Sequence, residues 1–149
     1  MLTKKGKYGL KALVHLAGLP AGQLAFVNDI AVRNNIPKKF LDAILGELRN
    51  AGFVQSRKGK DGGYRLARLP AEIKVGHVIR VLDGPLAPIP CASRTRYEPC
   101  EDCDEVTCQV RRMMLEVRQA IADVLDNRSL AEMRDAANDD VLAGIKYQL

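Results

Sequence analysis

Residues 37–66 have the sequence PKKFLDAILGELRNAGFVQSRKGKDGGYRL, an amphipathic stretch followed by a glycine-rich one. From Phe40 onward the apolar residues recur at intervals of three and four, the period of a helix that buries one face. We therefore predict a helix from Pro37, at the first helical position, to about Asn50, with Phe40 in the core. Gly52 follows as a left-handed terminator.

A β-hairpin is predicted directly after this helix. Residues 53–56 and 64–67 are two short strand-like segments, and the three glycines between them allow positive φ at a tight tip. The tip carries the cations Arg57, Lys58 and Lys60. A basic finger of this size fits the DNA minor groove or a ridge of phosphates. The glycine run lacks the Gly-Lys-Ser/Thr ending of a nucleotide-binding loop. Because the hairpin directly follows the predicted helix, we interpret it as a wing.

Helices are also predicted on the amino-terminal side of this stretch. Residues 3–18 have a helical period of apolar residues, with Thr3 as the expected N-cap. Asn28 can cap a short helix that runs to Asn34. A tight turn then leads into the helix at Pro37, and two helices joined in this way form a helix-turn-helix pattern.

Composition and charge fit a DNA-facing module joined to a different one. The chain has 149 residues, of which 47% are hydrophobic and 28% are charged, as in a globular protein. Residues 1–68 carry a net charge of +9, whereas residues 69–149 carry −4. Aromatic residues make up 5%, so a stacking platform for single strands is not expected. No apolar run is long enough to span a membrane, and we expect a cytoplasmic protein.

The second half of the chain is expected to carry a dimerisation helix. A short helix over 75–82 and a proline-rich connector over 85–90 precede a long helix from Val106 to about Asp126. The apolar positions of this long helix form a narrow heptad-like seam: Val110, Met114, Val117, Ile121 and Val124. A homodimer would bury the seam and would match a palindromic operator in double-stranded DNA. Ser129 opens a terminal helix with a capping box.

The expected fold is mainly α with a small β-hairpin wing. Three regions are predicted: a winged helix-turn-helix DNA-binding domain over 1–84, a cysteine-containing sensor loop over 85–108, and the dimerisation helix with a C-terminal helix over 109–149.

All four cysteines lie in that loop, in the arrangement Cys91-x8-Cys100-x2-Cys103-x4-Cys108. Clustered cysteines in a chain without a signal peptide are more often metal ligands or redox groups than structural disulfides. Four thiolates suit an iron–sulfur cluster, two-iron or four-iron, or zinc as the lesser expectation. Free thiols, or a disulfide formed on oxidation, stay open. The acidic residues around the cysteines should raise the thiol pKa values, which argues against a nucleophilic thiol. No catalytic base accompanies the cysteines, so we do not expect an enzyme.

Motifs distributed over most of the chain point to one family. They are Leu2-Thr3-Lys4, Tyr8-Gly9-Leu10, Ile30-Ala31, Ile36-Pro37, Phe40-Leu41, Leu45, Leu48-Arg49-Asn50-Ala51-Gly52-Phe53-Val54, Ser56, Gly59, Gly62-Gly63-Tyr64-Arg65-Leu66-Ala67-Arg68 and Asp83-Gly84-Pro85. In these residues the chain resembles the IscR-type winged-helix regulators, which include NsrR, RirA and CymR.

The resemblance implies a transcription factor that senses iron–sulfur status, iron, nitric oxide or redox state. By position, Cys91, Cys108 and one of Cys100 or Cys103 match the three cysteines that hold a cluster in many members. The fourth cysteine here makes ligation by all four an option. Lys7 stands where some relatives have an acidic ligand, and it cannot take that role. A cluster-free regulator of the same family, gated by a partner protein or a metabolite, is the alternative.

The DNA contacts are expected from three places in the winged domain. We predict that the helix starting at Pro37 enters the major groove and that the wing holds the backbone or the minor groove. The candidate DNA-binding residues are Lys4, Lys5, Asn28, Pro37, Lys38, Lys39, Arg57, Lys58, Gly59, Lys60, Gly62 and Tyr64.

Overall fold

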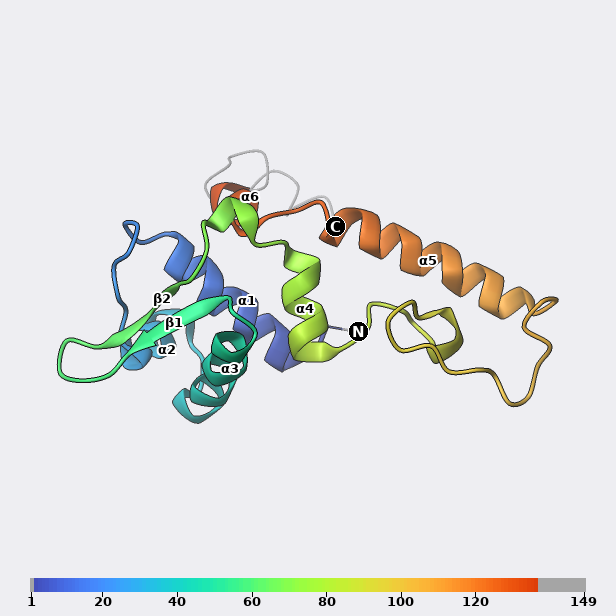
Figure 1. The fold of residues 1–149 in the computed structure, drawn as a ribbon, viewed down its shortest axis with the longest axis horizontal. Helices are drawn as coiled ribbons and strands as arrows, with labels where there is room; N and C mark the ends of the chain where they lie inside the picture. Colours follow the sequence, from blue (N-terminus) through green and yellow to red (C-terminus); the bar gives the residue numbers. More distant parts are fainter. Residues whose placement is uncertain (1, 137–149) are drawn as a thin grey trace.

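The computed structural model describes residues 2–136, which form a winged helix-turn-helix body and a long extension (Figure 1). The elements are α1 (Lys4–Ala17), α2 (Val27–Asn34), α3 (Lys38–Asn50), β1 (Val54–Arg57), β2 (Gly63–Leu66), the 3-10 turn η1 (Pro70–Glu72), α4 (Val75–Asp83), the 3-10 turn η2 (Pro90–Ala92), α5 (Gln109–Leu125) and α6 (Leu130–Ala136). The predicted fold class, mainly α with a hairpin wing, is confirmed. Within the described residues no helix is long and apolar enough to cross a membrane.

The ends of the amino-terminal helices follow the sequence prediction in part. The Thr3 side chain accepts a hydrogen bond from the backbone N–H of Gly6 and caps α1 as predicted. The cap assigned to Asn28 is wrong, because α2 already begins at Val27 and its N-cap is Phe26, which makes no side-chain bond. Pro37 is the N-cap of α3 and precedes its first helical residue by one position.

The core lies where α1 packs against α2, α3, α4 and α6. The buried stripe of α3 contains Leu41, Ile44, Leu45 and Leu48. Phe40 was predicted to join them, and this is wrong, because its side chain is 62% exposed. At 100° per residue, Phe40 lies about a quarter turn from the middle of that stripe, so its ring leaves the core.

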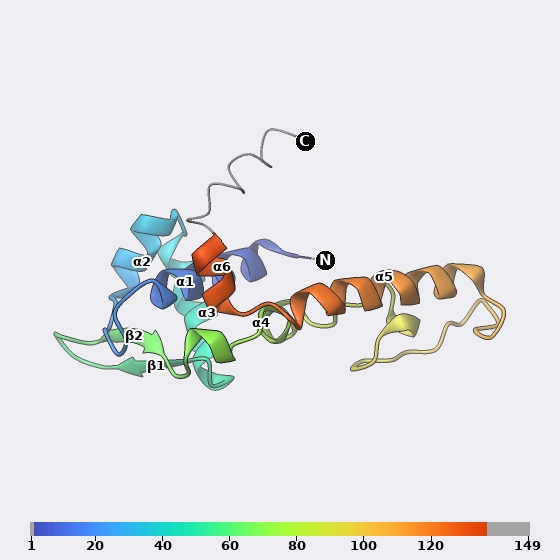
Figure 2. The same ribbon diagram turned by 90° about the horizontal axis from the view of Figure 1, so that it is seen from above.

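The wing is a two-stranded antiparallel hairpin that projects from one end of the body (Figures 1 and 2). Its register pairs Val54 with Leu66 and Arg57 with Gly63. Ala25, in the loop before α2, forms a further bridge with Tyr64 through two backbone hydrogen bonds of 2.8 Å. The hairpin is therefore attached to the helix-turn-helix unit at both strands, because β1 follows α3 in the chain and β2 pairs with Ala25.

The extension consists of the segment after α4, the cysteine loop and α5 (Figure 2). The long helix begins at Gln109 rather than at Val106, because residues 104–108 form a turn in which the N–H of Cys108 donates to Asp104 O at 2.9 Å. After α5 the chain returns to the body, where Leu130 is fully buried. Ser129 Oγ accepts from the N–H of Glu132 at 3.2 Å, which is one half of the predicted capping box. Residues 137–149 of the predicted third region lie outside the described part.

Candidate functional site

The start of α3 presents polar and cationic groups to solvent. Pro37, Lys38 and Lys39 are all exposed, and Lys38 makes only a loose ion pair with Asp42, at 3.8 Å between Nζ and Oδ2. Asn28 is exposed in the first turn of α2. The structure thus leaves these three α3 residues and Asn28 free to approach a ligand, as a DNA contact requires.

The wing carries cations that the body does not neutralise. Arg57, Lys58 and Lys60 are exposed, and none forms an ion pair with another residue in the described range. Gly62 keeps the tip narrow, since a Cβ there would lie 2.1 Å from the carbonyl oxygen of Arg57. Gly59 has a φ of 108°, which favours glycine. The resulting finger is thin and positively charged, which suits a groove lined by phosphates.

Three other predicted contact residues differ in their surroundings. Lys4 is exposed at the start of α1. Lys5 forms an ion pair with Glu47 of α3 at 2.7 Å, so its charge is already balanced. Tyr64 is half-buried against the core and holds the wing to Ala25 through its backbone. Lys4 is therefore the better placed of the two lysines for a phosphate.

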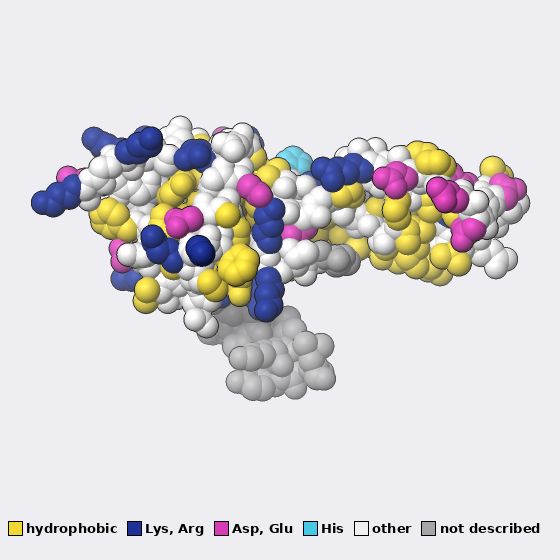
Figure 3. Space-filling model, turned by 90° about the horizontal axis from the view of Figure 1, so that it is seen from below, with side chains coloured by type: hydrophobic (Ala, Val, Ile, Leu, Met, Phe, Trp, Pro, Cys, Tyr) yellow, Lys and Arg dark blue, Asp and Glu magenta, His cyan; other side chains and the backbone are white. Residues whose placement is uncertain are grey.

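Sequence reasoning missed two exposed apolar residues on the helix-turn-helix unit. Val32 of α2 is 81% exposed, and Phe40 lies in the first turn of α3 beside Lys39. An angular analysis of the α3 stripe would have separated Phe40 from the core residues. Figure 3 shows Lys and Arg side chains over the winged body, while hydrophobic side chains gather over the extension.

The cysteine loop places two thiols and a carboxylate close together, and Cys103 also interacts with Cys108. The ligand atoms of Cys100, Asp102 and Cys103 all lie within 4.8 Å of one another. Cys91 is buried in η2 and Cys108 caps α5, and neither belongs to this group of ligand atoms. Of the four predicted ligands, the structure brings Cys100 and Cys103 together, with Asp102 beside them.

The thiols differ in acidity. Hydrogen bonding to Cys100, burial, and hydrogen bonding to Cys108 raise the pKa of Cys103 to about 12. Cys108 behaves in the opposite way: as the N-cap of α5 it accepts from the backbone N–H of Arg111 at 3.4 Å, and this bond lowers its pKa. The expectation that the acidic residues raise every thiol pKa is therefore wrong for Cys108.

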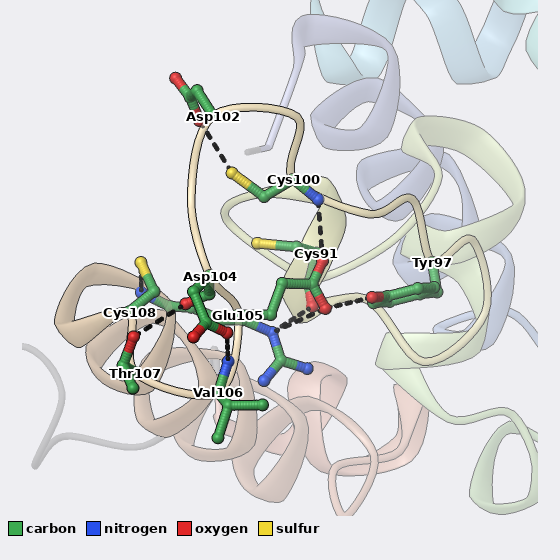
Figure 4. A network of polar contacts seen from close by, with 10 residues as sticks. Cys91, Tyr97, Cys100, Asp102, Asp104, Glu105, Val106, Thr107 and Cys108 are labelled. Carbon is green, nitrogen blue, oxygen red and sulfur yellow. Dashed lines mark hydrogen bonds and ion pairs between the residues drawn. The ribbon is translucent and has the colours of Figure 1, made fainter.

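The Glu105 carboxylate connects several parts of the cysteine loop. Its carboxylate accepts from the N–H of Cys100 at 2.8 Å and from the Tyr97 hydroxyl (Figure 4). These bonds hold the pKa of Glu105 below its usual value. Arg111 lies 3.9 Å from the same carboxylate and donates from Nε to the carbonyl oxygen of Cys91 at 3.0 Å. Arg111 therefore links η2 to the first turn of α5.

Comparison with known proteins identifies this architecture. The profile of the Rrf2 family, described as iron-dependent transcriptional regulators, matches residues 2–136. A Rhodobacter capsulatus protein named as an rrf2-like HTH-type transcriptional regulator is 42% identical over 142 residues, 93% of this chain and 95% of the relative. CymR of Bacillus subtilis, named as an HTH-type transcriptional regulator, is 33% identical over 98% of both chains.

Solved structures agree with the sequence relatives. The structure of CymR, described as the global cysteine regulator of B. subtilis, has a TM-score of 0.76 at 32% identity and covers 91% of this chain and 97% of its own. IscR of T. potens has a TM-score of 0.73 at 32% identity, covering 92% of this chain and 88% of its own. The resemblance noted in the sequence is confirmed, and the chain belongs to the Rrf2 family of transcriptional regulators.

Proposed function

We propose that this regulator binds operator DNA as a homodimer and that the cysteine loop switches the binding by holding an iron–sulfur cluster. The observation that carries the proposal is the position of the wing and of the cysteine loop on either side of the connector after α4. A basic wing without ion-pair partners among the described residues lies at one end of the molecule, and the loop that carries all four cysteines lies at the other (Figures 1 and 4).

The DNA interface is built from α3 and the wing. The start of α3, with Lys38, Lys39 and Phe40 exposed, enters the major groove. The Phe40 ring supplies an apolar surface that can contact a thymine methyl group. Arg57, Lys58 and Lys60 hold phosphates or the adjacent minor groove. The remaining candidates Lys4, Lys5, Asn28, Gly59, Gly62 and Tyr64 contact the backbone or shape the surface that does.

The dimer is formed through α5. Its outward face is apolar and exposed at Val110, Met113, Val117 and Val124. Two members of the predicted seam lie elsewhere, since Met114 is half-buried and Ile121 packs against the core of the body. Packing of α5 against the rest of the chain uses other faces, toward η2 and α4. A row of exposed apolar side chains along one helix suits a second helix with the same row, and a two-fold pair would place two reading heads on a palindromic site.

The residues of the loop fit an iron–sulfur cluster. Soft thiolate donors are the ligands that such clusters take, and the sulfurs of Cys100 and Cys103 already lie within 4.8 Å of each other. Cys91, Cys108 and one or both of Cys100 and Cys103 would hold it. When bound, the cluster supplies a centre that reacts with oxidants and nitric oxide. Because Cys91 belongs to η2 and Cys108 caps α5, ligation by both would fix these two elements relative to each other.

Analysis of bound metal tests this proposal. Protein purified without air should contain iron and acid-labile sulfide, and Cys91→Ala should lose both. The matched controls are two single variants, Cys100→Ala and Cys103→Ala. Because the family pattern needs one of these two cysteines, at least one of the variants should keep its iron and sulfide. Colourless protein without iron after reconstitution would contradict the cluster.

A cluster-free mode is the second candidate. The similarity to CymR, described as a cysteine regulator, favours it. In that mode a partner protein or a metabolite gates the DNA binding, while the cysteines are free or hold zinc. Stoichiometric zinc in place of iron and sulfide would support this mode.

A further inference from the structure

A cavity of about 150 Å³ lies where α4, the connector after it and α5 meet, and none of its lining residues is a cysteine. Three arginines line it: Arg80 from α4, Arg94 from the segment after η2, and Arg118 from α5. Ser93 and Thr95 add hydroxyl groups, and Leu86, Ala87 and Ala122 add apolar surface. Such convergence of polar groups beside an apolar wall is typical of small-ligand sites.

Arg118 is the unusual member of this set. Its residue exposure is 9%, and its Nε has no hydrogen-bond partner among the described residues. A buried charged donor without a partner is unfavourable, and native structures seldom leave one unless a ligand or water completes it. Arg118 lies on the side of α5 toward the connector, about a quarter turn from the exposed apolar row.

Among the described residues no carboxylate accepts a hydrogen bond from Arg118, although Asp123 lies near enough to act on its charge. Its Nη2 donates to Gln119 Oε1 at 3.3 Å, and the Arg94 guanidinium donates to the same oxygen at 3.1 Å. Two cations thus share one neutral amide oxygen. Burial and the nearby Arg94 lower the pKa of Arg118 below its usual value, and the opposing effect of Asp123 is smaller.

The acidic residues of the cavity are already engaged. Asp126 accepts two hydrogen bonds from Arg80, at 2.6 and 2.8 Å. Asp123 accepts from Gln119 Nε2 at 2.7 Å, which points the amide oxygen toward the arginines. With three arginines and two aspartates, the lining carries one excess positive charge. The cavity is therefore complementary to a monoanion.

We propose that this cavity is a binding site for a small organic carboxylate, held by Arg118 and Arg94. Guanidinium groups bind carboxylates through paired N–H donors, and the free Nε of Arg118 is one such donor. The volume lies below the usual 300–1,000 Å³ of ligand pockets, so the ligand has few heavy atoms. The short apolar wall fits a two- to four-carbon chain.

Titration of the full-length protein with sodium acetate tests the proposal. The reporter is the Nε–Hε resonance of Arg118 in ¹⁵N-labelled protein, assigned by its loss in Arg118→Gln. Acetate should shift this resonance saturably and raise the Tm, whereas sodium chloride at equal ionic strength should do neither. Sodium phosphate in a parallel arm separates a carboxylate site from a site for inorganic anions.

Two variants complete the test, because Arg118→Gln removes a buried side chain and can lower stability. Arg94 is exposed, so Arg94→Gln should keep the fold and weaken acetate binding at least tenfold. Arg128→Gln, an exposed arginine outside the cavity, is the matched control and should bind acetate as the unchanged protein does.

Several results would overturn the assignment. These are no saturable shift up to 100 mM acetate, an equal response to chloride, saturation by phosphate alone, or unchanged acetate affinity in Arg94→Gln. Conversion of a dimeric protein to a monomer by Arg118→Gln, without acetate binding in the unchanged protein, would show that the partner of Arg118 is a second copy of the chain.

Discussion

Arg80 of α4 and Asp126 at the end of α5 form a two-pronged ion pair, with N–O distances of 2.6 and 2.8 Å. The pair joins the winged body to the extension. Gly76 stands one turn before Arg80, where a Cβ would lie 2.0 Å from Asp126 Oδ1, so only glycine leaves room for this carboxylate. The orientation of the long helix relative to the body therefore depends on these side chains.

Removal of this pair should lower stability in a pH-dependent manner. The hydrogen bond from Arg80 holds the pKa of Asp126 below its ordinary value of 3.8, so the pair stabilises the fold fully above that pH. The stabilisation is lost as the pH falls through the lower, folded-state pKa. Asp126→Asn should cost about 1 kcal/mol at pH 7, because both side chains are about one-third exposed and water screens them.

Thermal unfolding at several pH values measures this effect. The Tm difference between Asp126→Asn and the unchanged protein should persist at pH 5 and shrink in strong acid. Glu132→Gln, which breaks the exposed ion pair with Arg128, should change the Tm little. A Tm difference that grows in acid would contradict the assigned sign.

Loss of a wing lysine should weaken binding to all DNA sequences alike. Lys58 is exposed and lacks a described ion-pair partner, so Lys58→Ala removes a phosphate contact without disturbing the fold. The slope of log affinity against log salt should become shallower by about 1 per protomer. Lys74→Ala, at the N-cap of α4, serves as the control. An unchanged affinity and slope in Lys58→Ala would exclude the wing from the interface.

Phe40 and Leu41 are neighbours with opposite roles. Phe40→Ala should leave the Tm almost unchanged and reduce operator affinity by about 1 kcal/mol, through a lost thymine contact. Leu41→Ala, at a residue with no exposed surface, should lower the free energy of unfolding by about 2–5 kcal/mol. Binding titrations measure the operator affinity, and chemical denaturation measures the free energy of unfolding. Both use samples whose oligomeric state has been checked by sedimentation. A large loss of stability in Phe40→Ala would show that the Phe40 ring packs in the core.

The exposed row on α5 should control the oligomeric state. Val117 is 37% exposed and Val124 is 56% exposed, so a charge at either position is tolerated by the monomer but not by a buried seam. Val117→Asp should convert the dimer to a monomer in analytical ultracentrifugation. Glu116→Gln, on a neighbouring face, should remain dimeric. A Val117→Asp protein that stays dimeric would place the interface elsewhere.

The sequence predicted the elements whose stabilising interactions are local. The helices α1 and α3, the Thr3 cap and the positive φ of Gly59 and Gly63 depend on neighbours within a few residues, and these are confirmed. Gly62 does not have a positive φ. The error at Asn28 comes from competition between local signals. Asn28 can cap a helix, but Val27 has already entered one.

The arginine-lined cavity could not be foreseen in the same way. Arg80, Arg94 and Arg118 are far apart in the sequence and share no motif. Only the folding of the connector against α5 brings them together. The cysteines, in contrast, lie close in sequence, so their grouping was predictable while their unequal acidity was not. The difference between Cys103 and Cys108 depends on which thiol caps α5.

The central claim is that the cysteine loop controls DNA binding, and one measurement tests it most directly. Operator fragments are first selected from a random DNA pool with protein purified without air. The affinity for them is then compared before and after exposure to nitric oxide, for the unchanged protein and for Cys91→Ala. We predict a change of at least tenfold in the unchanged protein and none in Cys91→Ala. Equal affinity in both states of the unchanged protein, or an intact response in Cys91→Ala, would contradict the account.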